Sequence, residues 1–261
     1  MNEEPRKLIA VTRPVSPSLA QCELTHIPRA PIDVARAAAQ HAAYERLLSS
    51  LGATLVRIAA APECPDAVFI EDTAIVLDEI AVIARPGAAS RRAESAAVAA
   101  ALSRYRPLRS MEAPATLDGG DVLRLGRTLW VGRSRRTNQP AIEQLQSFVT
   151  PFGYRVVPLD FTGCLHLKSA VTALEDELLL MNPAWVSAAA FPGCEAVFVD
   201  EREPHAANAL RVAGTIVYPS GLPRTRERLT GRGLRVTATD CSELTKAEGA
   251  VTCCSLLFEA E

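Results

Sequence analysis

Two adjacent cysteines near the C-terminal end are the strongest candidate nucleophiles in the chain. They lie in the segment Thr252-Cys253-Cys254-Ser255, which follows Gly249. Neighbouring cysteines cannot pair without strain, and on a strand their side chains point to opposite faces. One thiol can then be buried in the core while the other faces a cleft and, as a thiolate, attacks an electrophilic carbon. Taken alone, the segment favours the simpler interpretation of two buried, inert thiols.

His166 is the candidate acid or base for such a nucleophile. It stands in Leu165-His166-Leu167-Lys168-Ser169, just after Gly163, where we expect a strand to begin. Imidazole exchanges protons near neutral pH, although a histidine between two leucines is more often structural. The other three histidines lie in polar, helical or loop contexts and are weaker candidates: His26, His41 and His205.

Two acidic segments can serve a reaction centre. Asp118-Gly119-Gly120-Asp121 reads by itself as a turn before a strand, but its glycines also permit a close approach to a ligand. In residues 66–72, three acids bracket an apolar stretch that we expect to be a strand, with Asp66 and Asp72 on the same side. Buried carboxylates need cationic partners, so these acids either end in water or grip a cation such as a guanidinium.

Two arginine segments, Ser90-Arg91-Arg92 and residues 134–138, each follow an expected strand. An arginine there can hold a carboxylate, although a solvated surface residue is the ordinary interpretation. The chain contains no GxxxxGK[ST] motif and no GxGxxG between a strand and a helix, so no phosphate cradle is predicted. It contains no CxxC pair either, which leaves a structural zinc site without support.

The composition narrows the class of protein. The 261 residues carry a formal net charge of −2, with 48% hydrophobic and 5% aromatic residues, as in a single globular domain spanning residues 1–261. No basic stripe predicts binding to nucleic acid, and the longest apolar run, residues 96–102, is too short to cross a membrane. The N-terminus lacks a secretory pattern and the seven cysteines are irregularly spaced, so we expect a cytoplasmic protein without a disulfide framework.

The elements that must position these residues recur along the chain. Strand–turn–strand patterns repeat at intervals of roughly 40–50 residues, over residues 74–84, 122–131, 170–181 and 209–218. Helical patterns lie between them, over residues 32–51, 90–104, 140–148 and 224–229. A fifth unit built from terminal strands, residues 8–12 and 251–258, would close a ring and protect its edges. The pattern alone leaves an open α/β sheet with helices on both faces equally possible.

Together, these segments resemble the dimethylarginine dimethylaminohydrolases of the pentein, or guanidine-modifying, superfamily. The similarity runs almost end to end and is carried by seven segments in order: residues 33–37, 68–72, 84–88, 117–122, 134–138, 165–169 and 252–255. The resemblance implies an α/β fold, a five-bladed α/β propeller with pseudo-fivefold repeats and the site in its central channel. It also implies hydrolysis of asymmetric dimethylarginine and monomethylarginine to citrulline, with release of dimethylamine or methylamine.

The resemblance also assigns roles to residues. For catalysis it implies that Cys253 is the nucleophile and His166 the acid/base, and that Asp118 is the acid that orients the imidazole. For the substrate it implies that Asp66 and Asp72, with Glu71 close by, bind the guanidinium. Arg91 and Arg136 would hold the α-carboxylate, and the backbones of Leu24 and Ala247 would contact the α-amine. Many relatives have a branched apolar residue where Ala247 stands, which affects how tightly that end is packed.

The chemistry follows from the residue types. A thiolate attacks the guanidinium carbon, His166 protonates the departing amine, and water cleaves the resulting thiouronium. No metal or organic cofactor is required, although zinc can occupy the Cys253–His166 pair as an inhibitor. The nearest alternatives are an arginine deiminase or an amidinotransferase on the same scaffold, and a more distant one is a non-catalytic binder of arginine-like ligands. A monomer and a homodimer both remain open.

Overall fold

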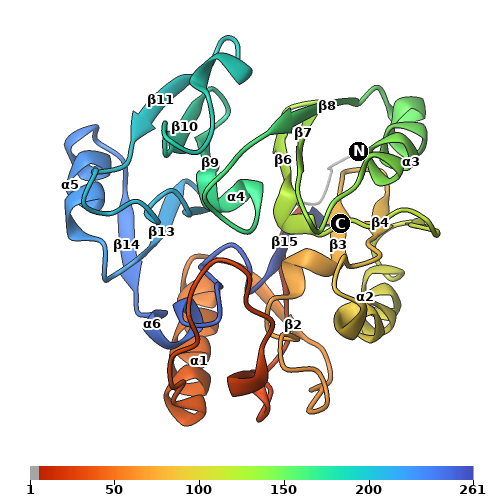
Figure 1. The fold of residues 1–261 in the computed structure, drawn as a ribbon, viewed down its shortest axis with the longest axis horizontal. Helices are drawn as coiled ribbons and strands as arrows, with labels where there is room; N and C mark the ends of the chain where they lie inside the picture. The colour runs from red at the N-terminus through yellow and green to blue at the C-terminus, as the bar shows by residue number, and fades with distance from the viewer. Residues whose placement is uncertain (1–5, 261) are drawn as a thin grey trace.

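The computed structural model describes residues 6–260, whose strands form five three-stranded sheets arranged as blades around a centre (Figure 1). In each sheet the first two strands run antiparallel and the third lies parallel to the middle one. Blade by blade, the strands are β15 (Leu256–Ala260), β1 (Lys7–Thr12) and β2 (Thr54–Arg57); β3 (Ala74–Val76), β4 (Ala81–Ile83) and β5 (Leu108–Ser110); β6 (Val122–Leu125), β7 (Thr128–Arg133) and β8 (Arg155–Asp160); β9 (Val171–Glu175), β10 (Leu178–Met181) and β11 (Glu195–Phe198); β12 (Leu210–Val212), β13 (Thr215–Pro219) and β14 (Val236–Thr239).

Each parallel pair needs a crossover, and helical segments provide it. In blade order these are α1 (Val34–Ser50), η3 (Ala89–Glu94) with α2 (Ser95–Leu102), α3 (Gln139–Val149), the short η6 (Ala188–Ala190) and α5 (Pro223–Gly231). Local signals start two of them, because Asp33 accepts a hydrogen bond from the Arg36 amide and Asn138 accepts one from the Ala141 amide.

The hydrophobic core is divided into five clusters, each of which joins two neighbouring blades. One cluster, for example, packs Ile75 and Val82 of the second blade against Val122 and Leu129 of the third. The ring closes where β15 pairs with β1, with Ile9 opposite Phe258. The five-bladed α/β propeller is therefore confirmed, and the open sheet is excluded. None of the helices within residues 6–260 is both long and apolar enough to span a membrane.

Three local expectations were wrong. Residues 251–254 form turns, and the last strand begins only at Leu256. Residues 66–72 form turns followed by η2 (Ile70–Thr73), not a strand, because the amides bond back three residues, as from Phe69 to Asp66. His166 precedes a single helical turn, α4 (Leu167–Ala170), and β9 starts after it. In each case the residues that carry chemistry lie in connections between the blades.

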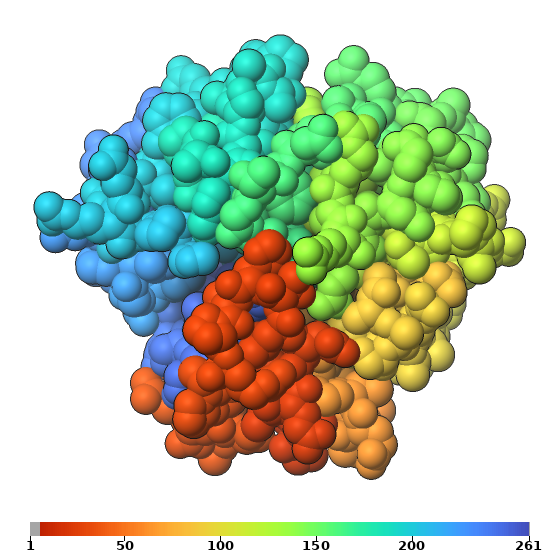
Figure 2. Space-filling model, in the orientation of Figure 1, coloured from red at the N-terminus to blue at the C-terminus, as the bar shows by residue number. Residues whose placement is uncertain are grey.

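The centre of one face is covered by the N-terminal part of the chain, red in Figure 2. This covering segment, residues 23–27, is held from the opposite end of the sequence. The carboxylate of Glu248 accepts hydrogen bonds from the backbone amides of Thr25, His26 and Ile27 at 2.7, 2.6 and 3.1 Å. Glu248 itself has a positive φ of 59°, an uncommon conformation for a non-glycine residue.

Candidate active site

A small closed cavity lies beneath this covering segment. Its lining comes from the connections of several blades and consists of Glu23, Asp66, Phe69, Asp72, Arg91, Arg136, Leu165, His166, Ala247, Glu248, Gly249 and Cys253. Seven of the ten site residues expected from the sequence are in that lining; Leu24, Glu71 and Asp118 are not. The cavity measures about 20 Å³, room for about one water molecule, and Glu23 of the covering segment is part of its lining.

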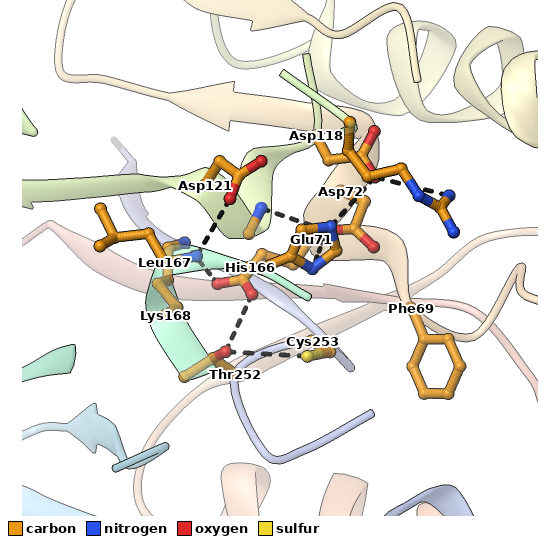
Figure 3. Close-up of polar contacts among 12 residues, drawn as sticks. Phe69, Glu71, Asp72, Asp118, Asp121, His166, Leu167, Lys168, Thr252 and Cys253 are labelled. Atoms are coloured by element: carbon orange, nitrogen blue, oxygen red, sulfur yellow. Dashed lines mark hydrogen bonds and ion pairs between the residues drawn. The ribbon is translucent and has the colours of Figure 1, made fainter. Parts of the chain in front are cut away.

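His166 lies between two carboxylates (Figure 3). Its Nε2 atom is 3.1 Å from Asp118 and its Nδ1 atom is 3.6 Å from Asp72. Burial by itself would lower the pKa of His166, but Asp72, Asp118 and Asp121 outweigh burial and raise the pKa to about 9. The imidazole is therefore protonated at neutral pH and able to donate a proton.

Two further residues of the Asp118–Asp121 segment, Asp121 and Gly120, lie next to the histidine segment. Asp121 accepts a hydrogen bond from the amide of Leu167, the residue after His166, at 3.0 Å. Burial raises the pKa of Asp121 to about 6. Gly120 lies so close that a Cβ atom there would be 2.7 Å from the imidazole Nδ1 and 2.9 Å from an Asp72 oxygen. A glycine is thus required for His166 and Asp72 to approach each other.

Asp72 is bound on two sides by protein groups. It forms an ion pair with Arg91 and accepts a hydrogen bond from the Gly120 amide at 3.1 Å. Burial alone would raise its pKa, yet the nearby positive charges of His166 and Arg91 lower it. Asp66, which accepts a hydrogen bond from the Glu23 amide at 3.1 Å, instead has its pKa raised by burial.

The two candidate arginines differ in how fully they are engaged. Arg91 donates to the Asp72 and Glu94 carboxylates and to the backbone carbonyls of Asp66 and Phe69, so each of its guanidinium nitrogens is occupied. The Arg136 guanidinium donates no hydrogen bond to any group within residues 6–260, and its ion pair with Asp118 is long, at 3.9 Å. Arg136 is therefore better placed to accept an incoming carboxylate.

The two adjacent thiols are separated by the turn that carries them. Cys253 faces the cavity, whereas Cys254 is 2% exposed and packs in the core beside α1. Alternation along a strand was the expected reason for this separation, but the turn produces it instead. Burial and the negative charges of Glu71 and Asp72 raise the pKa of Cys253 to about 12. The thiol is consequently neutral at neutral pH, and a positive charge placed beside it would favour the thiolate.

Glu71 and Leu24 lie beside the cavity but do not line it. The Glu71 carboxylate binds Lys168 at 2.6 Å and Thr252 at 2.8 Å, and all three residues line a second cavity of about 640 Å³. Leu24 packs against the core beside α1, next to the residues that Glu248 holds. Sequence reasoning gave no role to Glu23, Leu165 or Glu248, because no local pattern shows that these residues reach the same cavity.

One set of atoms in the site can in principle hold a metal ion. Ligand atoms of Asp72, Asp118 and His166 lie within 4.8 Å of one another. A carboxylate and imidazole set suits several divalent ions. Arg91 and Arg136 already form ion pairs with the two carboxylates, so a metal would have to compete with these cations.

Comparison with known proteins identifies close relatives, although no family model matches the chain. A dimethylarginine dimethylaminohydrolase of Streptomyces coelicolor is 39% identical over 255 residues, 97% of each chain. One from Pseudomonas aeruginosa is 34% identical over 87% of this chain and 90% of its own. A solved structure of the Pseudomonas enzyme, a cysteine-to-serine mutant complexed with citrulline, aligns with a TM-score of 0.92 at 32% identity, covering 98% of this chain and all of that one. The N-terminal domain of a cyanobacterial arginine dihydrolase shares the fold, with a TM-score of 0.81 at 21% identity over 96% of this chain and 98% of its own.

Proposed function

The chain belongs to the dimethylarginine dimethylaminohydrolase family, and we propose that it hydrolyses asymmetric dimethylarginine and monomethylarginine to citrulline, releasing dimethylamine or methylamine. It is a cysteine-dependent hydrolase, as are its relatives in this family. The observation that supports the proposal most directly is the cavity in which Cys253, His166 and Asp72 come together.

In this proposal Cys253 attacks the guanidinium carbon. Burial and the carboxylates of Glu71 and Asp72 disfavour the thiolate and raise the pKa of Cys253 to about 12. A bound guanidinium between Asp66 and Asp72 brings a positive charge to the same place, which lowers that pKa, so that the thiol loses its proton to solvent. The enzyme thereby forms its nucleophile only when the substrate is present.

His166 then acts first as an acid and afterwards as a base. The attack by sulfur gives a tetrahedral adduct, and the imidazolium donates its proton to the methylated nitrogen, so that neutral dimethylamine leaves and a thiouronium remains on Cys253. The neutral imidazole next removes a proton from water, which attacks the thiouronium carbon. Collapse of the second adduct expels the Cys253 thiolate and yields citrulline. Asp118 keeps the imidazole oriented through the 3.1 Å contact with Nε2.

The other end of the substrate is assigned to the groups near Arg136. We assign the α-carboxylate to Arg136 with support from Arg91, and the α-amine to the backbones of Leu24 and Ala247. We assign Glu71, the neighbour of Asp72, to the guanidinium end; its carboxylate binds Lys168 and Thr252, which line the second cavity with it.

Within residues 6–260 all seven cysteines are free thiols, which supports a reducing compartment such as the cytoplasm.

Incubation with asymmetric dimethylarginine followed by amino-acid analysis tests the function. We expect citrulline and dimethylamine in equal amounts from the wild type and none from Cys253→Ser. A parallel incubation with arginine measures ammonia release. If the protein releases ammonia from arginine but no dimethylamine from dimethylarginine, it is an arginine deiminase and this proposal is wrong.

A further inference from the structure

We propose that Asn208 is a positioning residue that fixes the nucleophile turn relative to the histidine segment. This inference rests on the proposed function, because it concerns the geometry between Cys253 and His166. Asn208 lies just before β12, in a different blade connection from either of these residues, and its side chain is 3% exposed. Nothing in its local sequence marks it as part of the site.

The amide of Asn208 joins the two catalytic segments directly. Its Oδ1 accepts a hydrogen bond from the backbone amide of Thr252 at 3.1 Å, and its Nδ2 donates to the Thr252 hydroxyl at 2.9 Å. The same Nδ2 donates to the backbone carbonyl of Lys168 at 3.1 Å. Thr252 immediately precedes Cys253, and Lys168 lies two residues after His166, so one side chain spans both segments.

A carboxamide is the side chain that meets these requirements. The three contacts need one acceptor and two donors in one plane, which is the inventory of asparagine. An aspartate at this position would keep the acceptor but would place a negative oxygen against the Lys168 carbonyl. A leucine would fill the same space and make none of the three bonds.

The backbone on both sides of Asn208 is also held. The hydroxyl of Thr172 donates to the Ala207 carbonyl at 2.7 Å and accepts from the Ala209 amide at 3.1 Å. Thr172 is 2% exposed and lies in β9. The amide of Asn208 is therefore presented from a fixed position rather than from a loose connection.

Glu71 and Lys168 complete a closed circuit of hydrogen bonds with the Asn208 amide. Figure 3 shows the part of it that joins Glu71, Lys168 and Thr252. Lys168 binds one Glu71 oxygen, the Thr252 hydroxyl binds the other, and Asn208 links Thr252 back to the Lys168 carbonyl. Lys168, Glu71 and Thr252 line the second cavity. His166, two residues before Lys168, lines the first, as do Asp72 and Cys253, the residues that follow Glu71 and Thr252. The circuit thus links the three segments that carry Asp72, His166 and Cys253, through residues that lie next to these reacting groups or two positions away in the sequence.

The test compares Asn208→Leu with Asn182→Leu. Asn182 is a matched control, because it is 5% exposed and its amide also bonds two backbone groups, the Pro204 carbonyl and the Ala184 amide, away from the site. We expect both variants to lose similar thermal stability. Only Asn208→Leu should lower kcat, by about 100-fold as for a displaced catalytic group, with KM nearly unchanged because the substrate-binding arginines remain in place.

Asn208→Asp provides a second variant if Asn208→Leu does not fold. The aspartate retains the shape of the side chain and the oxygen that accepts a hydrogen bond from the Thr252 amide. We expect kcat to fall at least about 10-fold, with the same small change in KM. Normal kcat in a folded Asn208 variant, or an equal loss in the Asn182 control, would overturn the inference. The wild-type assay separates the two claims: a wild type that yields no citrulline defeats the proposed function, whereas an active wild type with unaffected Asn208 variants defeats only the positioning role.

Discussion

The carboxylate of Asp118 lies 3.1 Å from Nε2 of His166, and Asp118 has no exposed surface. A second Asp118 oxygen accepts a hydrogen bond from the Gly87 amide at 2.9 Å, which fixes the carboxylate in place. Asp72, Asp118 and Asp121 together stabilise the imidazolium in the folded state, against the opposing effect of burial, and raise the pKa of His166 to about 9 from an ordinary value of 6.5. This relationship has consequences for both stability and catalysis as the pH changes.

We expect activity to fall above about pH 9, because expulsion of dimethylamine requires the imidazolium. The same raised pKa contributes folding stability that is complete below pH 6.5 and is lost as the pH rises through about 9. Asp118→Asn removes the charge and should move the alkaline limb of kcat/KM about one pH unit lower. A pH–rate profile measures this shift, and an unchanged limb would show that Asp118 does not set the protonation of His166.

The two adjacent cysteines should behave differently when replaced. Cys253→Ser removes the thiol that faces the cavity and should abolish turnover, whereas Cys254→Ser should retain most of it, because Cys254 packs in the core. Mass spectrometry of a quenched reaction should detect a covalent adduct on Cys253 alone. An active Cys253→Ser variant with an inactive, folded Cys254→Ser variant would reverse the assignment.

The periodic parts of this structure were predictable from sequence, and the site was predictable only in part. Apolar runs on either side of a short turn identified the hairpins at β3–β4 and β12–β13. The helix expected over residues 32–51 is α1, which begins at Val34 because Asp33 caps it. Ring closure by the two terminal strands was predicted and is confirmed, with Ile9 opposite Phe258. The repeat pattern alone could not separate it from an open sheet, because no local pattern encodes pairing between the two ends of the chain. Residues 66–72 were predicted to be a strand because acids bracket a short apolar stretch. Turn hydrogen bonds, and the hydrogen bonds from Arg91 to the carbonyls of Asp66 and Phe69, give them a different conformation.

The two arginines should give different kinetic defects. Arg136→Ala should raise KM roughly 10- to 100-fold with little change in kcat, because in the proposed function its guanidinium holds the α-carboxylate, a part of the substrate that does not react. Arg91→Ala should lower kcat as well, because Arg91 binds Asp72 and the backbone that precedes it. Arg135→Ala is the control, since Arg135 is an exposed neighbour that does not line the cavity. Equal effects from the Arg91 and Arg136 variants would contradict this division of roles.

Glu248 should control how firmly the covering segment is closed. Glu248→Ala removes the acceptor of three backbone amides, so we expect faster hydrogen exchange at Thr25, His26 and Ile27. The substrate should also leave more readily, which raises KM by roughly 10-fold. Hydrogen exchange followed by mass spectrometry measures the first effect, with Glu227→Ala on α5 as a distant control. Unchanged protection of residues 25–27 would show that other contacts hold the segment.

Gly120→Ala tests whether the close approach of His166 and Asp72 matters for catalysis. The new methyl group would lie 2.7 Å from the imidazole Nδ1 and 2.9 Å from an Asp72 oxygen, so at least one of these side chains must move. A displacement of that size can cost about 100-fold in kcat. Gly221→Ala is the matched control, because a Cβ atom there meets nothing within 4 Å. Steady-state kinetics should therefore show a loss of kcat in Gly120→Ala alone, and wild-type kcat in a folded Gly120→Ala variant would mean that the reacting groups tolerate a wider separation than the structure shows.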